Sequence, residues 1–420
     1  MHHFDYIDDT LYAEKLKLTE LAKAVGTPFY CYSEATLRRH INVFQNAFGQ
    51  SDMLTAFSVK ANSNLSVLKI LASEGAGADV VSGGELRRAR AAGIAREKIV
   101  FSGVGKTAEE LALALDEGIF QFNVESEPEL DLLAQIATSK NKRAPIAFRV
   151  NPDVSAGGHE KISTGVAEVK FGIAWDQART LYAKANKMEG IDVRGVDVHI
   201  GSQISELAPF EVAFQKVADL VKALRSDGCT IERVDLGGGL GIPYGDSDEE
   251  PPHPDEYAKM IRRISDPLDV KLIFEPGRMI VGNAGILVSQ VVYVKQGADR
   301  KFLILDAGMN DLIRPALYDA WHKIIPVTKP ASDFCEPYDV VGPICETGDR
   351  FTRERQLPVM QAGDLVAFMS AGAYGAVQAS EYNTRPLIPE VLVNGENYAI
   401  IRQRPDYKEM LDRDKIADWL

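Results

Sequence analysis

The sequence is poor in cysteine, with only Cys31, Cys229, Cys335 and Cys345 in 420 residues, and no two of them form a CxxC pair. Its seven histidines show no metal-ligand spacing either. Scattered thiols do not suggest a disulfide framework or a zinc centre. We therefore predict neither disulfides nor a metal site.

Long apolar segments and an excess of basic charge are also missing. No stretch approaches the length of a membrane span, and the first 20 residues include Asp5, Asp8, Asp9 and Glu14 but no apolar run. The formal net charge is −13, from 47 basic and 60 acidic residues, which disfavours non-specific binding to nucleic acid or anionic membranes. We expect a cytoplasmic protein with no signal peptide, no membrane contact and no nucleic-acid partner.

The sequence does contain a regular alternation of short β-rich stretches and amphipathic segments. The β-rich stretches occupy residues 53–60, 77–82, 98–103, 121–126, 146–151, 193–201, 231–238 and 271–277. The intervening segments have helical periodicity, and several end on glycine, the usual helix stop. Eight strands alternating with helices predict an α/β fold, a TIM-like (β/α)8 barrel over residues 33–280, with an open doubly wound sheet as the alternative.

After residue 280 the pattern changes to β-rich, turn-punctuated segments. This change predicts a second domain, a mostly antiparallel β-sandwich or barrel formed by residues 281–420 together with residues 1–32. Residues 245–256 read as an acidic exposed loop, to which we assign no function.

Chemically versatile residues collect where the predicted barrel strands end. They are Lys60, Asp79, Ser82, Arg149, Asn151, His199, Ser202, Gly237, Gly238, Gly239, Glu275 and Arg278. In such barrels the active site is built at the carboxyl ends of the strands. Lys60 is the most informative of them, because an ammonium group at the end of an apolar strand must reach either solvent or a partner.

Several of these residues suit one cofactor. A lysine can carry pyridoxal 5′-phosphate covalently, and the DLGGGLG run at 235–241 offers backbone N–H groups to a phosphate. Glu275 can keep a pyridine nitrogen protonated, and His199 can stack on the ring. Taken singly, these features also fit a tight turn, a surface ion pair between Glu275 and Arg278, and a core histidine. Together they predict a pyridoxal phosphate site.

Six motifs in order, FSVKAN, HIGSQ, DLGGGLG, EPGR, GPICETGD and AGAYG, make the whole chain similar to the fold-type III pyridoxal-phosphate-dependent decarboxylases. The resemblance implies that Lys60 carries the cofactor, His199 stacks on it and Glu275 pairs with its pyridinium. The implied cofactor-binding set is Lys60, Asp79, His199, Ser202, Gly238, Gly239, Glu275, Gly277, Arg278 and Tyr374.

The resemblance is strongest to members that convert meso-2,6-diaminopimelate to L-lysine and CO2, the last step of lysine biosynthesis. It implies that Cys345 is a catalytic proton donor, so the predicted catalytic residues are Lys60, Cys345 and His199. It also implies a homodimer with shared active sites, in which the loop carrying Cys345 crosses from the partner subunit. The implied substrate-binding residues are Arg278, Arg314, Tyr318, Glu346 and Tyr374. Arg314 is suited to bind a distal carboxylate in a bidentate manner.

Alternatives remain open at this point. Ornithine, arginine or carboxynorspermidine decarboxylation is the nearest, followed by an amino-acid racemase of the alanine racemase type and by a cofactor-binding protein without catalysis. Arg314 could instead be a surface residue beside Asp311, and Cys345 a buried inert thiol. Relatives often carry tyrosine where Phe57 stands and serine where Thr347 stands, which leaves the subtype open rather than the chemistry.

Overall fold

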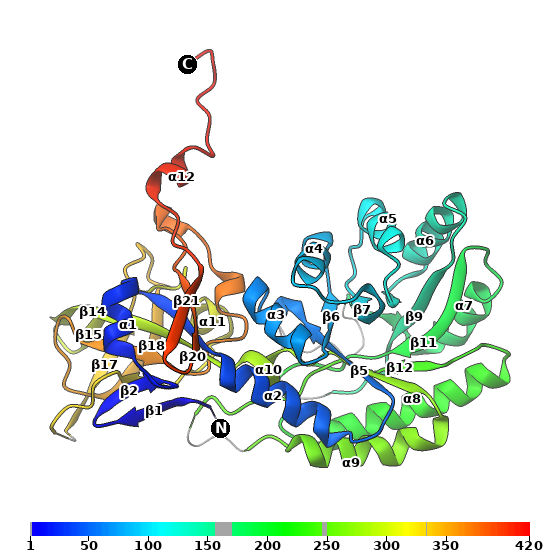
Figure 1. Cartoon of the computed structure of the whole chain (residues 1–420), viewed down its shortest axis with the longest axis horizontal. Coiled ribbons are helices and arrows are strands. Elements are labelled where there is room, and N and C mark those ends of the chain that lie inside the picture. The colour runs from blue at the N-terminus through cyan, green and yellow to red at the C-terminus, as the bar shows by residue number, and fades with distance from the viewer. Residues whose placement is uncertain (1, 156–169, 246–249, 333) are drawn as a thin grey trace. The chain divides into compact units, whose positions relative to one another are not determined.

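The computed structural model describes the chain except for residues 1, 156–169, 246–249 and 333. It divides into two compact units (Figure 1). The barrel unit comprises Arg38–Pro243 and Glu249–Ile280, and the sheet unit comprises Met1–Leu37, Tyr244–Asp248 and Val281–Leu420. Of the residues predicted to form an acidic loop at 245–256, positions 246–249 lie outside the described residues, and helix α9 begins at Pro254.

The barrel unit is built around eight parallel strands. They are β5 (Met53–Ser58), β6 (Gly77–Val80), β7 (Ile99–Phe101), β8 (Gln121–Val124), β9 (Ala144–Asn151), β11 (Ile191–Asp197), β12 (Arg233–Asp235) and β13 (Lys271–Phe274), with the short β10 (Ile173–Ala174) beside β9. Their order is β9-β11-β12-β13-β5-β6-β7-β8, and β8 pairs again with β9. The ring is therefore closed, so the predicted (β/α)8 barrel is confirmed and the open-sheet alternative is wrong.

Helices follow the strands and surround them (Figure 1). They are α2 (Glu34–Ala47), α3 (Leu65–Ser73), α4 (Gly83–Ala91), α5 (Ala108–Glu117), α6 (Glu127–Ser139), α7 (Ala178–Ala185), α8 (Ala208–Ser226), α9 (Pro254–Ser265) and α10 (Arg278–Val281). Polar residues start five of them: the side chains of Asn64, Ser82, Thr107, Ser126 and His253 each accept a backbone N–H of the first turn. Each cap satisfies a backbone N–H group that has no partner within the helix, and it therefore determines the residue at which the helix begins.

The barrel interior changes from apolar to polar along the strands. One layer is a small hydrophobic cluster of Leu54, Ala56, Val100 and Ile273. Toward the carboxyl ends of the strands the inward positions are polar, with Asp79, Asn123 and Asp235 fully buried. Buried polar groups are costly unless they are hydrogen-bonded or paired, so this end of the barrel has been built for chemistry rather than for stability.

The sheet unit contains a nine-stranded sheet ordered β18-β17-β15-β14-β4-β20-β21, with β19 joining β14 to β16. Its strands are β4 (Phe29–Ser33), β14 (Gly285–Gln296), β15 (Lys301–Leu305), β16 (Ile324–Pro326), β17 (Cys335–Val341), β18 (Arg350–Pro358), β19 (Leu365–Phe368), β20 (Glu390–Asn394) and β21 (Asn397–Arg402). Two pairings, β15 with β17 and β4 with β20, are parallel, and the others are antiparallel. The predicted mostly antiparallel second domain is confirmed.

Both faces of this sheet are covered. Along β14, Leu287 belongs to one hydrophobic cluster while its neighbours Ile286 and Val288 belong to another, as the two-residue period of a strand requires. A three-stranded sheet, β1 (Phe4–Ile7), β2 (Thr10–Ala13) and β3 (Leu16–Lys17), and helix α1 (Leu18–Val25) contribute to the second cluster. The short helices α11 (Arg314–Tyr318) and α12 (Tyr407–Leu411) complete the unit.

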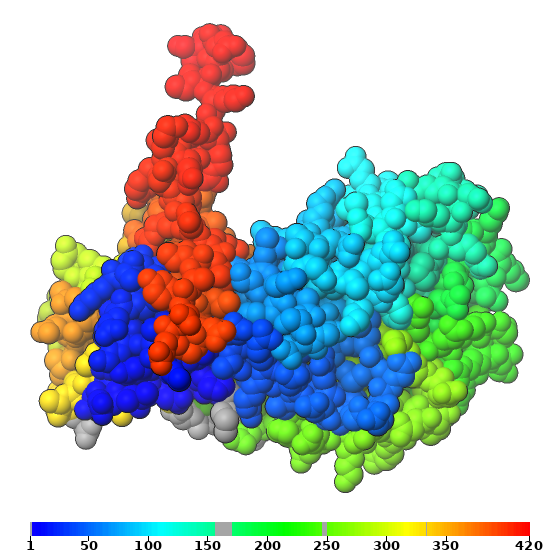
Figure 2. Space-filling view, viewed as in Figure 1, coloured from blue at the N-terminus to red at the C-terminus, as the bar shows by residue number. Residues whose placement is uncertain are grey.

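The C-terminal segment after β21, red in Figure 2, contains large apolar side chains that are exposed to solvent. Ile416, Trp419 and Leu420 are 85%, 86% and 93% exposed. Among the helices that the structure describes, none combines the length and the apolar character needed to cross a membrane.

Candidate active site

Lys60 lies just beyond the end of β5. The strand stops at Ser58, and Val59–Ala61 form a single 3-10 turn, so the prediction that Lys60 itself ends the strand is corrected by two residues. The Lys60 Nζ atom lies 3.1 Å from Asp79 Oδ2, and the Ser58 hydroxyl donates to the same oxygen at 2.7 Å. Although its side chain is 39% exposed, Lys60 has an ionic partner and is not simply a solvent-facing lysine.

His199 follows β11 and is held as a neutral ring. The backbone N–H of Gly238 donates to its Nδ1 atom at 3.2 Å, so Nδ1 carries a lone pair and the ring proton lies on Nε2. Burial lowers the pKa of His199 well below its ordinary value, and the positive charges of Arg149 and Lys60 lower it further. This hydrogen bond fixes the ring against the glycine loop, and the stacking of His199 on the cofactor stays a prediction.

The glycine loop after β12 has a backbone that no other residue could reproduce. A Cβ atom at Gly238 would lie 2.4 Å from the carbonyl oxygen of Glu275, and one at Gly239 would lie 2.7 Å from that of Gly201. Gly239 also has a φ of +114°, where side chains are disfavoured. Within the loop, the N–H groups of Gly237, Gly238 and Gly241 bond to Asp235, His199 and Ile204. Gly239 is therefore the loop residue whose N–H we expect to meet an anion such as a phosphate.

Two further predicted residues meet beside this loop. The Arg278 guanidinium donates from Nη2 to the Ser202 hydroxyl at 3.1 Å. Gly277, immediately before Arg278, is packed so closely that its Cβ would lie 2.9 Å from that of Ala61. The turns after β5, β11 and β13 therefore approach one another, and they bring the residues predicted around Lys60, Ser202 and Gly277 to one end of the barrel.

Glu275 stands in a buried group of carboxylates. Its Oε1 atom accepts hydrogen bonds from Ser102 Oγ at 3.1 Å and Asn123 Nδ2 at 3.3 Å. One carboxylate oxygen of each of Asp197, Asp235 and Glu275 lies within 4.8 Å of the other two. Burial raises the pKa of Glu275 well above its ordinary value, and the negative charge of Asp235 raises it further. Such crowded negative charge favours a cation at this place, and the protonated ring nitrogen of pyridoxal phosphate fits that need.

Arg314, at the start of α11 in the sheet unit, is buried, so the alternative of a surface arginine beside Asp311 is wrong. Its side chain is oriented by two residues that the sequence did not indicate. Arg314 Nη1 lies 2.8 Å from His322 Nε2, and its guanidinium lies 4.6 Å from the ring centre of Tyr244. Because His322 Nδ1 donates to the carbonyl of Met369 at 2.9 Å, Nε2 is the acceptor that faces Arg314.

The remaining predicted residues also lie in the sheet unit. Cys345 is exposed, which makes the alternative of a buried inert thiol wrong, and its N–H donates to Asn383 Oδ1 at 2.8 Å. Glu346 accepts a hydrogen bond from Tyr382, which raises the pKa of that tyrosine. Tyr318 accepts one from Gln378 at 3.3 Å. Tyr374 has a φ of +55°, and such strain in a non-glycine residue is often found at functional sites.

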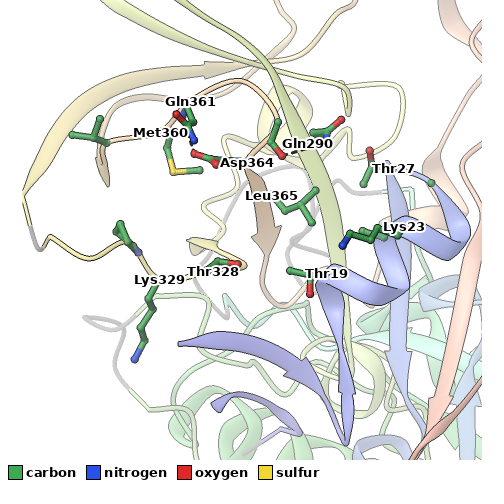
Figure 3. A pocket seen from close by; sticks show the side chains of 15 residues that line it. Thr19, Lys23, Thr27, Gln290, Thr328, Lys329, Met360, Gln361, Asp364 and Leu365 are labelled. Carbon is green, nitrogen blue, oxygen red and sulfur yellow. Dashed lines mark hydrogen bonds between the residues drawn. The ribbon is translucent and has the colours of Figure 1, made fainter. Parts of the chain in front are cut away.

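A separate cavity of about 810 Å³ lies in the sheet unit (Figure 3). Lys23, Gln290, Thr328 and Asp364 are among the residues that line it. None of the predicted site residues does so, and the lysine and threonine side chains are ordinary surface groups. The candidate active site is therefore the polar end of the barrel, not this cavity.

Several polar residues of the barrel end were not among the predicted site residues: Ser58, Ser102, Asn123, Asp197 and Asp235. The sequence did carry a signal for them. Each is a polar residue at an inward position near the end of a short apolar strand, as in QFNV and RVD. Two-residue periodicity applied to all eight strands would have brought them together.

Comparisons with known proteins are consistent with this geometry. Residues 34–282 match the family model of the pyridoxal-dependent decarboxylase, pyridoxal binding domain. Curated diaminopimelate decarboxylases from Zymomonas mobilis and Vibrio cholerae are each 48% identical, covering 99% and 98% of this chain and the same shares of the relatives.

Solved structures agree with these matches. A crystal structure of diaminopimelate decarboxylase from Helicobacter pylori complexed with L-lysine is 40% identical with a TM-score of 0.91, covering 94% of this chain and 99% of that one. One from M. jannaschi is 37% identical with a TM-score of 0.94, covering 100% of this chain and 99% of that one. The predicted enzyme class and cofactor are confirmed, in place of a racemase or a silent cofactor-binding protein. The chain belongs to the pyridoxal-dependent decarboxylases.

Proposed function

We propose that this enzyme decarboxylates meso-2,6-diaminopimelate to L-lysine and CO2, the last step of lysine biosynthesis, in the cytoplasm. The observation that carries the proposal is the buried guanidinium of Arg314, held by a neutral His322 and the face of Tyr244. A substrate with a second amino-acid end supplies a carboxylate for such a group. Ornithine and lysine have no carboxylate at their distal end. Binding either of them would leave the buried Arg314 guanidinium without the carboxylate it is suited to, so we expect both to be rejected strongly.

Names of close relatives support the same substrate. The curated relatives at 48% identity are diaminopimelate decarboxylases, and the Helicobacter pylori relative was crystallised with L-lysine. The lysine/ornithine decarboxylase from Vibrio vulnificus is only 20% identical and supports the fold alone.

The residues of the barrel unit would hold pyridoxal phosphate in complementary ways. Lys60 would be the attachment point. The N–H of Gly239, Ser202 and the backbone around Gly277 would receive the phosphate, while Gly238 holds His199 in place, and Glu275 would pair with the ring nitrogen. The bound cofactor supplies an electron sink for the bond that loses CO2. The neutral His199 contributes a flat apolar surface for the ring and adds no positive charge of its own.

The residues of the sheet unit would select and protonate the substrate. Arg314 receives the distal carboxylate, while Glu346 pairs with an ammonium group. Tyr318 and Tyr374 are the other members of the proposed substrate-binding set in this unit, and Arg278 is its member in the barrel unit. Cys345 delivers a proton from Sγ to the α-carbon after CO2 has left, and an exposed thiol is suited to that task.

We also propose a homodimer with shared active sites. Cys345 lies in an exposed turn, and the C-terminal segment exposes Ile416, Trp419 and Leu420. Exposed apolar side chains gathered in one segment favour contact with another chain. A symmetric pair would let each subunit lend its Cys345 to the other.

The proposal is tested by CO2 release from the holoenzyme with meso-diaminopimelate, ornithine, arginine and lysine offered separately. We expect turnover of meso-diaminopimelate alone, with L-lysine as product. Turnover of ornithine or lysine at a comparable rate would retain the family but overturn the substrate.

Replacing the arginine tests its role directly. Arg314→Gln should lower kcat/KM for meso-diaminopimelate by about 100-fold, because a buried bidentate carboxylate partner is lost. Cofactor binding should be unchanged. Arg353→Gln is the matched control, since Arg353 is an exposed arginine of β18 in the same unit. Equal activity of the two variants would contradict the assignment.

A further inference from the structure

The three buried carboxylates at the barrel end differ in their hydrogen bonds. Glu275 accepts from Ser102 and Asn123. Asp235 accepts from Asn123 Nδ2 at 3.1 Å and from the backbone N–H of Gly237 at 3.0 Å. Asp197 Oδ1, by contrast, is buried and has no hydrogen-bond partner among the residues that the structure describes. Asp235 and Glu275 are thus provided with donors, as anions require, whereas Asp197 Oδ1 has none.

The cations nearest to this group are directed elsewhere. Arg149 lies directly beside Asp197 in the register of β9 and β11, yet its guanidinium is 3.3 Å from Glu125 and stacks 4.8 Å from the ring centre of Phe171. Lys60 pairs with Asp79. Three carboxylates therefore face the single positive charge expected there, that of the protonated ring nitrogen of the cofactor. The arrangement carries an excess of negative charge unless one carboxyl keeps its proton.

We propose that Asp197 is a positioning residue that stays a neutral carboxylic acid and leaves Glu275 ionised to pair with the ring nitrogen of the cofactor. The inference rests on the role proposed above for Glu275. An ionised Asp197 within 4.8 Å would drive a proton onto Glu275, and a neutral Glu275 could not hold the ring nitrogen in its protonated form. A protonated Asp197 removes that repulsion and brings an O–H donor to its neighbours.

The electrostatic environment agrees with this geometry. Burial raises the pKa of Asp197 well above its ordinary value, and the negative charge of Glu275 raises it further, while Arg149 acts in the opposite direction. Asp197 is the last residue of β11, two residues before His199, and its own side chain is buried. The proposed proton therefore lies close along the chain to the residue predicted to stack on the cofactor ring.

Infrared difference spectroscopy of the substrate-free holoenzyme tests the protonation state. We expect the C=O stretch of a neutral carboxylic acid in the wild type near neutral pH, shifted in heavy water and absent in Asp197→Asn. A wild-type spectrum without a band that this substitution removes would overturn the proposal. The measurement uses no substrate, so a failure of the diaminopimelate assignment would not affect it.

Cofactor affinity gives a second readout. Asp197→Asn keeps a neutral group that can donate a hydrogen bond, so the Kd for pyridoxal phosphate should stay within about threefold of wild type, whereas Asp197→Ala should weaken it by about tenfold. The absorbance of the Lys60-bound cofactor should follow the same order. If Asn weakens binding as much as Ala does, Asp197 acts as an anion and the proposal is wrong.

A metal ion is the competing occupant of three carboxylates. Titration of the wild type and Asp197→Asn with Mg²⁺ and Zn²⁺ by calorimetry distinguishes it. We expect no heat that depends on Asp197. Stoichiometric binding that is lost in Asp197→Asn would make the group a metal site and overturn the neutral-acid assignment.

Discussion

Individual charged side chains in the barrel unit have different environments, and the environment decides what each can do. Lys60 is paired with Asp79 and partly exposed, which suits a residue that must react. Lys106 is fully buried and donates to the carbonyls of Gly103 and Asn123 and to Glu129, so its hydrogen-bonding capacity is used structurally. The comparison of the two lysines shows that burial alone does not identify a reactive lysine. The better indicators are partial exposure of the ammonium group and a position in the turn after a barrel strand.

Glu85, in the first turn of α4, gives a pH-dependent prediction at this scale. Burial raises its pKa to about 7 from an ordinary 4.5, against the N–H that Val81 donates to it. Between about pH 4.5 and pH 7 the unfolded chain loses this proton while the folded chain keeps it. Glu85 therefore lowers the free energy of unfolding increasingly over this range, and the loss is complete above about pH 7.

Glu85→Gln removes this effect and keeps the acceptor for Val81. We expect the variant to exceed the wild type in unfolding free energy by roughly 2 kcal/mol at alkaline pH, with the difference vanishing toward acid pH. Urea unfolding at several pH values measures it. Glu109→Gln, on the exposed surface of α5, is the control and should change little; a pH-independent difference for Glu85→Gln would contradict the argument.

The helices of the barrel depend on short local signals. Helix α5 begins with a full capping box, in which the Thr107 side chain accepts from the Glu110 N–H and Glu110 accepts from that of Thr107. It ends at Gly118 with a φ of +70°, where glycine has no steric cost. Both ends of the element are therefore specified by residues within one turn.

Thr107→Ala tests this at the scale of the element. Loss of the cap should cost about 1 kcal/mol of unfolding free energy, measured by urea denaturation, with cofactor binding retained. Thr180→Ala, on the exposed face of α7, is not the N-cap residue of its helix and should be neutral or slightly stabilising. Equal effects of the two substitutions would show that the cap contributes nothing.

The difference between local signals and tertiary contacts explains what could be predicted from the sequence. Local signals of a few residues, the strand at 271–277 or the glycine stop at Gly118, predicted all eight barrel strands and the helices between them. Arg314 was recognised, but its partners His322 and Tyr244 were not, because they meet it only through tertiary folding. Asp197 was missed for the same reason: one aspartate in a strand has no meaning until its neighbours are known.

At the scale of the whole molecule, the predicted machinery is divided between the two units. The barrel unit holds Lys60, His199 and Glu275, and the sheet unit holds Arg314 and Cys345. A division of this kind suits an enzyme in which one chain supplies the cofactor and another supplies the proton donor. In a symmetric dimer both contributions are made twice.

Subunit mixing tests this shared site. Lys60→Ala and Cys345→Ala homodimers should each be nearly inactive. After dissociation and reassociation of an equal mixture, half of the dimers are mixed and each contains one intact site, so about a quarter of wild-type activity should return. Mixing Lys60→Ala with Glu275→Ala is the matched control and should restore nothing, because both residues belong to the barrel unit. No recovery with Cys345→Ala, once mixed dimers have been verified by mass, would place Cys345 and Lys60 of each site on the same chain.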